Sequence, residues 1–201
     1  MMLPNPHIIH LEDCHERDYV KEHLEENFGH QEIPFFPAIR VRTNTTIMWK
    51  SPYARYKPML PGAVGCLESH IALYKSNPRG ILTVFEDDVV VKDSEGLSNF
   101  IRIFPKDYDI ILLGYNKIEK GNIENNIYHV KRFYGTHAMI LTENARQLLV
   151  EEYESQKPLA EPMDWLWSHV IEDNNLKTYA PLSPCIIQKP GLESQITGGR
   201  R

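Results

Sequence analysis

The sequence predicts a single α/β domain over residues 1–201, with a mostly parallel central sheet flanked by helices. Short apolar segments of strand length recur along the chain, at residues 7–11, 81–85, 109–113 and 138–141. Segments with apolar residues at helical spacing lie between and after them, including 61–75 and 143–153. Alternation of strands and helices is typical of sheets whose strands run mostly in one direction.

The first part of the chain predicts strand, helix and strand. Residues 7–11 form an apolar strand, and residues 12–26 form an amphipathic helix that ends at Gly29. Residues 36–41 are predicted as the second strand. The segment 43–61 has no convincing period, so we expect a long loop of the kind that often binds ligands.

A helix opens at Pro61 and runs to about residue 75, and the turn after it leads into the strand 81–85. The later elements are predicted in order, with a polar surface excursion at 116–126 between strands: a helix at 97–104, strands at 109–114, 128–133 and 138–141, helices at 143–153 and from 162, and one or two short strands within 179–188. Thr142 is the expected N-cap of the helix at 143.

Composition excludes several functional classes. The formal charge is −5, from 22 basic and 27 acidic side chains, and no basic block is present, so a nucleic-acid partner is not expected. The three cysteines (Cys14, Cys66 and Cys185) are far apart and odd in number, which disfavours a disulfide framework or a zinc knuckle. The sequence lacks a signal-peptide pattern and an apolar run of membrane-spanning length, so we expect a soluble, cytoplasmic protein with no transmembrane segment.

The strand at 81–85 ends in three consecutive acids, Glu86, Asp87 and Asp88. In open α/β sheets, ligands bind beyond the carboxyl ends of the strands. Glu86 and Asp88 form an acid-x-acid pair whose oxygens suit Mg²⁺ or Mn²⁺ bound against a diphosphate. The same acids are also compatible with a helix cap or a solvated loop. Dinucleotide-binding, P-loop and nucleophile-elbow motifs are absent from the sequence.

Five segments in order resemble glycosyltransferase family 25, which includes bacterial lipooligosaccharide galactosyltransferases and collagen hydroxylysine galactosyltransferases. They are GAVGCLESH at 62–70, FEDD at 85–88, DIILLG at 109–114, YGTHAMI at 134–140 and PMD at 162–164. The resemblance runs from about residue 8 to about residue 196. Two positions depart from the family pattern: His10 precedes Leu11 where Asn is usual, and His137 replaces a small residue.

The resemblance implies a GT-A-like fold and transfer of galactose or glucose from a UDP-sugar, with inversion at the anomeric carbon. A sugar of a lipooligosaccharide or another glycan, or a hydroxylysine-type peptide, is the implied acceptor. Asp88 is then the best candidate for a Mn²⁺ or Mg²⁺ ligand, assisted by Glu86 or Asp87.

An inverting transfer needs a carboxylate that takes the proton of the acceptor hydroxyl. Asp164 is the candidate, because it lies in the PMD segment beside Trp165 and Trp167, whose indoles suit a sugar. An acid at a helix start can instead simply stabilise the helix dipole, and the tryptophans can be core residues.

The remaining candidates are donor-binding residues, and each has a structural alternative: His10, Leu11, Arg17, Ser69, His70, Glu86, Asp87, Gly135 and Thr136. Arg17 can pair with phosphate or lie on a solvated helix face. His70 can contact the donor or be a hydrogen-bonded core histidine, and Gly135 can admit the donor or form a tight turn. His169 is a possible extra metal ligand, and Arg200 and Arg201 fit a tail.

Two other functions use the same residues. A metal-dependent phosphoester hydrolase would need a second ligand cluster, which the sequence does not show after another strand. A non-catalytic nucleotide-sugar-binding module would keep the metal site and lose the base.

Overall fold

The computed structural model describes residues 2–41, 59–157 and 161–192. The predicted binding loop at 43–61 and the basic tail therefore lie largely or wholly outside the described residues. Within these described ranges, ten strands form one sheet whose main path runs β2-β1-β3-β8-β5-β9-β7-β6. The strands are β1 (Pro6–His10), β2 (Phe35–Pro37), β3 (Leu82–Glu86), β4 (Val89–Val91), β5 (Ile110–Gly114), β6 (Lys117–Glu124), β7 (Ile127–Tyr134), β8 (Ala138–Leu141), β9 (Thr178–Pro181) and β10 (Ile186–Gln188).

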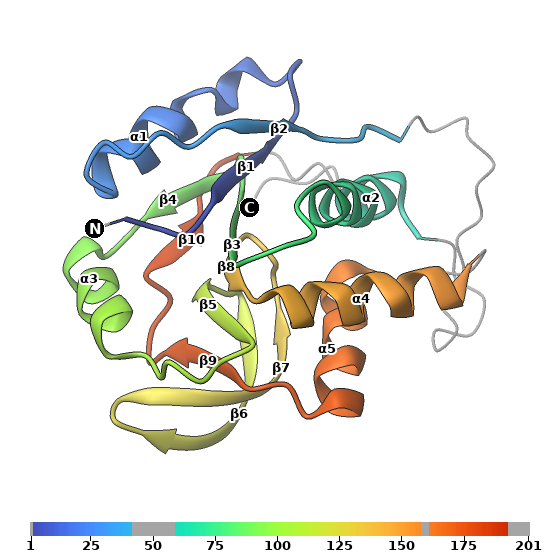
Figure 1. Ribbon diagram of the computed structural model, residues 1–201. Coiled ribbons are helices and arrows are strands. Elements are labelled where there is room, and N and C mark those ends of the chain that lie inside the picture. The colour runs from blue at the N-terminus through green and yellow to red at the C-terminus, as the bar shows by residue number, and fades with distance from the viewer. Residues whose placement is uncertain (1, 42–58, 158–160, 193–201) are drawn as a thin grey trace.

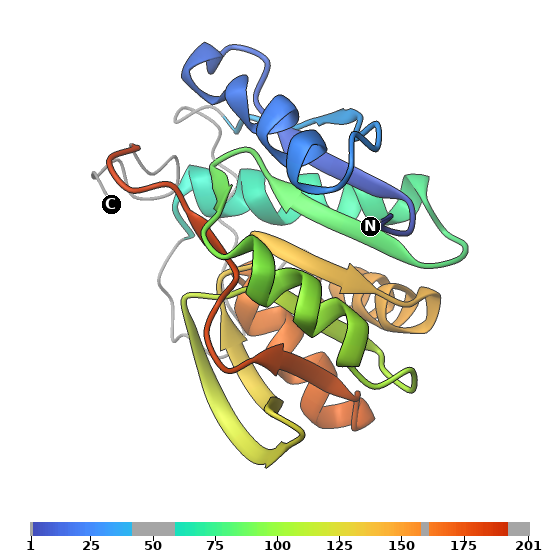
Figure 2. The same ribbon diagram turned by 90° about the vertical axis from the view of Figure 1, so that its left-hand side faces the viewer.

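Helices cover both faces of this sheet, as Figures 1 and 2 show. One layer holds α2 (Pro61–Ser76), α4 (Glu143–Gln156) and α5 (Met163–Asn174). The other holds α1 (Tyr19–Asn27), preceded by a short 3₁₀ turn at His15–Arg17, and α3 (Ser94–Ile103). The predicted α/β architecture is confirmed.

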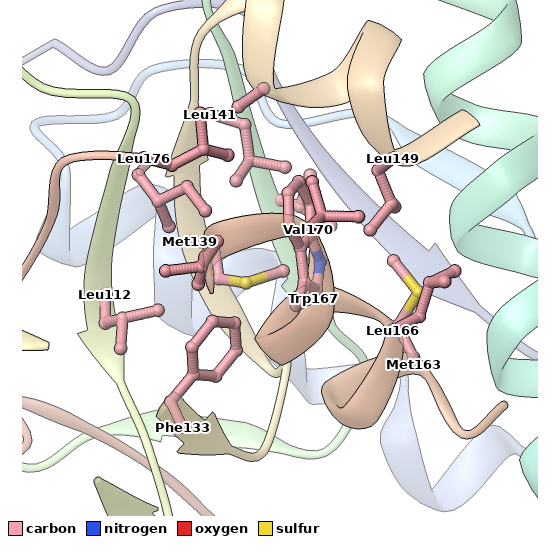
Figure 3. Packing of buried hydrophobic residues seen from close by; sticks show 14 of the residues in the cluster. Leu112, Phe133, Met139, Leu141, Leu149, Met163, Leu166, Trp167, Val170 and Leu176 are labelled. Carbon is pink, nitrogen blue, oxygen red and sulfur yellow. The ribbon is translucent and has the colours of Figure 1, made fainter. Parts of the chain in front are cut away.

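The strands alternate their side chains between two separate cores, as the period of two requires. Ile110 and Leu112 of β5 pack in the cluster under α2, α4 and α5, whereas Ile111 and Leu113 pack in the cluster under α1 and α3. Figure 3 shows the first cluster, where Trp167 and Val170 of α5 face the strands. Sheets buried on both faces explain why these strands read as continuous apolar runs.

The sheet is mixed at its centre. Strand β1 pairs in parallel with β2 and β3, and β5 pairs in parallel with β9 and β10. Between these groups lies β8, which is antiparallel to both β3 and β5. Strands β7 and β4 also run against their neighbours β9 and β10. Apolar composition predicts burial but not direction, so the reversal of β8 was not visible in the sequence.

The helix starts predicted at residues 61 and 143 are confirmed, whereas α3 starts at Ser94 rather than at residue 97. The Thr142 hydroxyl accepts a hydrogen bond from the Ala145 amide at 3.3 Å, and Asp93 caps α3 by accepting from the Gly96 amide at 2.8 Å. Helix α2 begins at Pro61, where the missing amide hydrogen is harmless. Helix α2, which carries Cys66, Ser69 and His70, has no side-chain cap and begins with this proline.

The segment 116–126 lies at the surface as predicted, but it contains a strand that was not predicted, β6. Most β6 side chains are exposed, and the strand forms a hairpin with β7 at the edge of the sheet. Asn125 and Asn126 form the turn, with φ angles of 51° and 64°. Positive φ at both positions suits Asn and a tight hairpin turn. The first predicted helix also differs, since α1 starts at Tyr19 rather than at residue 12.

None of the helices in the described part of the chain is long and apolar enough to cross a membrane.

Candidate functional site

A cavity of about 240 Å³ lies beyond the carboxyl ends of β1 and β3. Because these two strands are parallel neighbours, their ends meet at one edge of the sheet. The amino-terminal half of α2 and the segment that follows β2 complete the wall. The lining residues are Ile9, Leu11, Arg17, Ala38, Ile39, Arg40, Val41, Pro61, Gly62, Gly65, Cys66, Ser69, His70, Glu86, Asp87 and Asp88.

Asp87, the middle acid, is held by groups from the end of β1 and the turn after it. Its Oδ2 accepts a hydrogen bond from the Leu11 amide at 2.9 Å, and its Oδ1 accepts from Arg17 Nη1 at 2.5 Å. The His10 Nδ1 atom lies 3.2 Å from the same Oδ2 without hydrogen-bond geometry. Burial disfavours the charged form of Arg17, but the charge and hydrogen bond of Asp87 outweigh it and raise the pKa of Arg17.

Glu86 is a carboxylate clasped by α2 and by the segment before β8. Its Oε1 accepts a hydrogen bond from Thr136 Oγ1 at 2.8 Å and lies 3.3 Å from His70 Nε2. Burial favours the neutral acid, but the hydrogen bond and charge of His70, with His137 and Thr136, lower the pKa of Glu86 to about 2. Glu86 therefore stays ionised at neutral pH.

Asp88 is 4% exposed and lies against strand β10. Its Oδ2 is 3.2 Å from the side-chain nitrogen of Gln188, and its carbonyl accepts from the Lys189 amide at 2.6 Å. Burial, followed by the nearby charge of Asp88, raises the pKa of Tyr19. Gln188 and Lys189 were missed by the sequence reasoning. Residue 188 is 100 positions from residue 88, and nothing in the local pattern links the two.

Ser69 and His70 lie on the face of α2 that borders the cavity. The Ser69 hydroxyl donates to the Gly65 carbonyl at 2.6 Å and accepts from the Ile39 amide at 2.8 Å. It therefore ties α2 to the segment after β2. His70 is 1% exposed, and its Nδ1 lies 3.0 Å from the Tyr74 hydroxyl. Contact of either residue with a donor stays a prediction.

Gly135, Thr136 and Asp164 meet on the other side of Glu86. Gly135 has φ of 91°, a conformation that favours glycine, and a Cβ there would lie 2.9 Å from the Asn116 side-chain nitrogen. Burial raises the pKa of Asp164, opposed by hydrogen bonds from the amides of Trp165 and Gly135, and the charge of Glu86 raises it further. Asp164 is thus in the electrostatic neighbourhood of Glu86, although it does not line the cavity.

A sequence profile of glycosyltransferase family 25, described as an LPS biosynthesis protein family, matches residues 3–146. The chain belongs to glycosyltransferase family 25. The family is one of glycosyltransferases, so this protein is a glycosyltransferase. The matched region contains all three acids, the cavity wall on α2 and the Gly135–Thr136 pair, and it ends before Asp164. Comparison with curated protein sequences gives no match.

Three solved structures are among those similar to this chain. A glycosyltransferase involved in the glycosylation of the major capsid of PBCV-1 gives a TM-score of 0.48 at 10% identity, over 88% of this chain and 81% of that chain. A mutant of Drosophila beta-1,4-galactosyltransferase 7, in complex with manganese, UDP-Gal and xylobiose, gives 0.46 at 10% identity, over 91% and 69%. UDP-glucose pyrophosphorylase from Acinetobacter baumanii gives 0.45 at 12% identity, over 88% and 69%.

Other residues of this glycosyltransferase that were predicted to take part in function do not line the cavity that holds the three acids. His169 Nδ1 lies 2.6 Å from Oε2 of the fully buried Glu161, so its ring is paired within its own region. Trp167 is fully buried in the core, whereas Trp165 is 43% exposed. Of the two indoles, only Trp165 is available to stack on a sugar. Arg200 and Arg201 lie outside the described residues.

Proposed function

We propose that this glycosyltransferase moves a hexose, galactose or glucose, from a UDP-sugar to a hydroxyl of a glycan or of a hydroxylated peptide, with inversion. One observation carries the proposal. Both carboxylate oxygens of Asp87 accept hydrogen bonds, one from the Leu11 amide and one from Arg17. Glu86 and Asp88, which flank Asp87 in the sequence, line the same cavity. The end of β3 thus carries one acid that is fixed by hydrogen bonds, Asp87, and an acid-x-acid pair, Glu86 and Asp88, for binding a cation.

Glu86 and Asp88 fit a divalent cation of the Mg²⁺ or Mn²⁺ class, because both are carboxylates and Glu86 is ionised at neutral pH. When bound, such a cation would neutralise the negative charge of the leaving diphosphate. Gln188 beside Asp88 and Thr136 beside Glu86 orient the two carboxylates through hydrogen bonds. The Leu11 amide and Arg17 hold Asp87 and, through it, the turn that carries Asp88.

Asp164 is the proposed base. As the acceptor oxygen forms its bond to the anomeric carbon, the bond from that carbon to the diphosphate oxygen breaks, and the hydroxyl proton passes to the Asp164 carboxylate. Burial and the charge of Glu86 raise the pKa of Asp164, which makes its carboxylate a stronger proton acceptor. The exposed Trp165 next to it offers an aromatic face to an acceptor sugar.

The test is turnover of UDP-galactose and UDP-glucose over a panel of glycan and hydroxylysine-peptide acceptors, with Mn²⁺, with Mg²⁺ and with chelator. Asp164→Asn should reduce transfer by about 10²–10⁴-fold while donor binding persists. Asp88→Asn should abolish transfer and weaken metal-dependent donor binding. Asp173→Asn, an exposed change on the same helix as Asp164, is the matched control.

Three results would contradict the proposal. Hydrolysis of simple phosphate esters without sugar transfer would indicate a phosphoesterase. Donor binding without transfer to any acceptor would indicate a binding module. Full transfer by folded Asp88→Asn would remove the assigned cation ligand.

A further inference from the structure

Three different metal-binding side chains converge on one wall of the cavity. Cys66 and His70 are one turn apart on α2, and Glu86 faces them from the end of β3. One ligand atom from each residue lies within 4.8 Å of the other two. Glu86 Oε1 is 3.9 Å from Cys66 Sγ and 3.3 Å from His70 Nε2.

We propose that Cys66, His70 and Glu86 form a site for a thiophilic divalent cation of the zinc class, which does not involve Asp88 but shares Glu86 with the pair of Glu86 and Asp88. Tetrahedral zinc binds sulfur at about 2.3 Å and nitrogen or oxygen at about 2.0–2.2 Å. Ligand atoms then lie roughly 3.3–3.6 Å apart. The observed spacings need only a small shift of the thiol to reach this geometry.

The surrounding hydrogen bonds match those of a zinc site. A histidine that binds a metal usually donates a hydrogen bond from its other ring nitrogen, and a carboxylate that binds a metal usually accepts a hydrogen bond as well. The Tyr74 hydroxyl lies 3.0 Å from His70 Nδ1, and Thr136 Oγ1 donates to Glu86. These contacts hold the ring and the carboxylate in place.

Binding requires that one proton leaves and that another stays in place. The Cys66 thiol releases its proton to solvent, and the imidazole keeps its proton on Nδ1, facing the Tyr74 oxygen, so that Nε2 is free to ligate. All three ligands line the cavity, so the fourth position of a tetrahedral ion faces the cavity and is open to water or to a substrate oxygen.

A consequence follows that rests on the proposed function. An ion of the zinc class bound to Cys66 and His70 would also take the Glu86 oxygen nearest to them, so it would compete with the Mg²⁺ or Mn²⁺ partner of Asp88 for this shared carboxylate. Zinc then inhibits transfer in competition with Mn²⁺.

The test uses the full chain, freed of metal by chelation and titrated with Cd²⁺, whose bond to a thiolate gives an ultraviolet charge-transfer band. Wild-type protein should show a band that saturates at one Cd²⁺ per chain and is displaced by Zn²⁺. Cys66→Ser should lose the band, and Cys14→Ser, a change at another partly exposed cysteine, should keep it. Tyr74→Phe should weaken Cd²⁺ binding by about 10–100-fold, as loss of an outer partner does.

A wild-type chain without the band, or a Cys66→Ser variant that keeps it, would overturn the site. The Asp88→Asn variant separates this inference from the proposed function, because it should lose transfer and keep the cadmium band. Loss of the band in folded Asp88→Asn would show that the thiolate site depends on Asp88, which would overturn the ligand set of Cys66, His70 and Glu86. Zinc inhibition that persists unchanged in Cys66→Ser would refute the competition.

Discussion

Arg17 Nη1 lies 2.5 Å from Asp87 Oδ1, with the two side chains only 5% and 6% exposed. The pair joins the turn after β1 to the turn after β3. Removing one partner of a buried pair leaves the other charge in an apolar setting, which typically costs about 3–5 kcal/mol. Asp87→Asn should therefore lower the free energy of unfolding by about that amount, measured by urea denaturation.

The exposed pair of Arg132 and Glu172 is the matched control, with Nη2 and Oε2 2.6 Å apart at 46% and 60% exposure. Solvent screens this pair, so Glu172→Gln should change stability by less than about 1 kcal/mol. A double-mutant cycle with Arg17→Met and Asp87→Asn should give a favourable coupling energy. Additive effects of the two changes would show that the pair is not a unit.

The pKa of Asp164 predicts the acid side of the pH profile. Burial raises this pKa above its ordinary value of 3.8, and the base must be ionised to accept a proton. Transfer should thus fall with decreasing pH around a midpoint above 3.8, and that limb should be missing from the residual activity of Asp164→Asn. A profile whose acid limb is the same in both proteins would contradict the assignment.

The same shift predicts the sign of a stability change. A carboxyl group whose pKa is higher in the folded state makes the protein less stable as pH rises through that pKa. At neutral pH Asp164→Asn should therefore be at least as stable as the wild type, since Asn can still accept the Trp165 amide hydrogen bond, which is 3.0 Å long. Thermal unfolding of both proteins checks this. A clear loss of stability would make Asp164 a structural residue.

Gly114 ends β5 where it meets the carbonyl of Ile186 and the ring of His137. A Cβ at Gly114 would lie 2.4 Å from that carbonyl oxygen and 2.5 Å from His137 Nε2. Gly114→Ala should therefore cost about 1–3 kcal/mol, as overpacking does. At Gly121, on the edge strand β6, the nearest contact would be 3.2 Å, so Gly121→Ala should cost less in the same urea assay. Equal losses would remove close packing as the cause.

Arg146 is 2% exposed and donates to backbone carbonyls from two segments. It bonds to Leu141 at 2.9 Å, and to the turn before β3 through Asn77 at 3.0 Å and Gly80 at 2.9 Å. A lysine cannot reproduce this fork, and each buried acceptor left unpaired costs about 1–3 kcal/mol. Arg146→Lys should lower the unfolding free energy by at least about 2 kcal/mol. The exposed Arg102→Lys should change it by less than about 0.5 kcal/mol in the same titration.

The sequence predicted elements well where one physical signal dominated. Strand β3 was clear from its apolar run, and α4 from its period and its Thr142 cap. Strand β6 was missed because an exposed edge strand carries no apolar alternation, although Asn125 and Asn126 marked its turn. At this hairpin, the two asparagines of the turn were a stronger signal than the composition of the strand.

The sequence predicted which types of residue form the site, but not which of these residues contact one another. Three acids after a buried strand indicated a polar pocket, and Glu86 and Asp88 do line a cavity. The anchoring of Asp87 by Arg17 and the pairing of Asp88 with Gln188 depend on contacts 70 and 100 residues apart. These contacts depend on the order of the strands in the sheet, which no local sequence pattern indicates.

The reversed strand β8 has a consequence for how the chain assembles. Strands β3 and β5 are complete by residue 114, yet each finds its partner on this side only when residues 138–141 insert between them. A nascent or truncated chain that stops before residue 138 exposes two apolar strand edges, which invite association with other chains. We therefore expect amino-terminal fragments to aggregate, and expect folding of the whole protein to wait on this late, long-range closure.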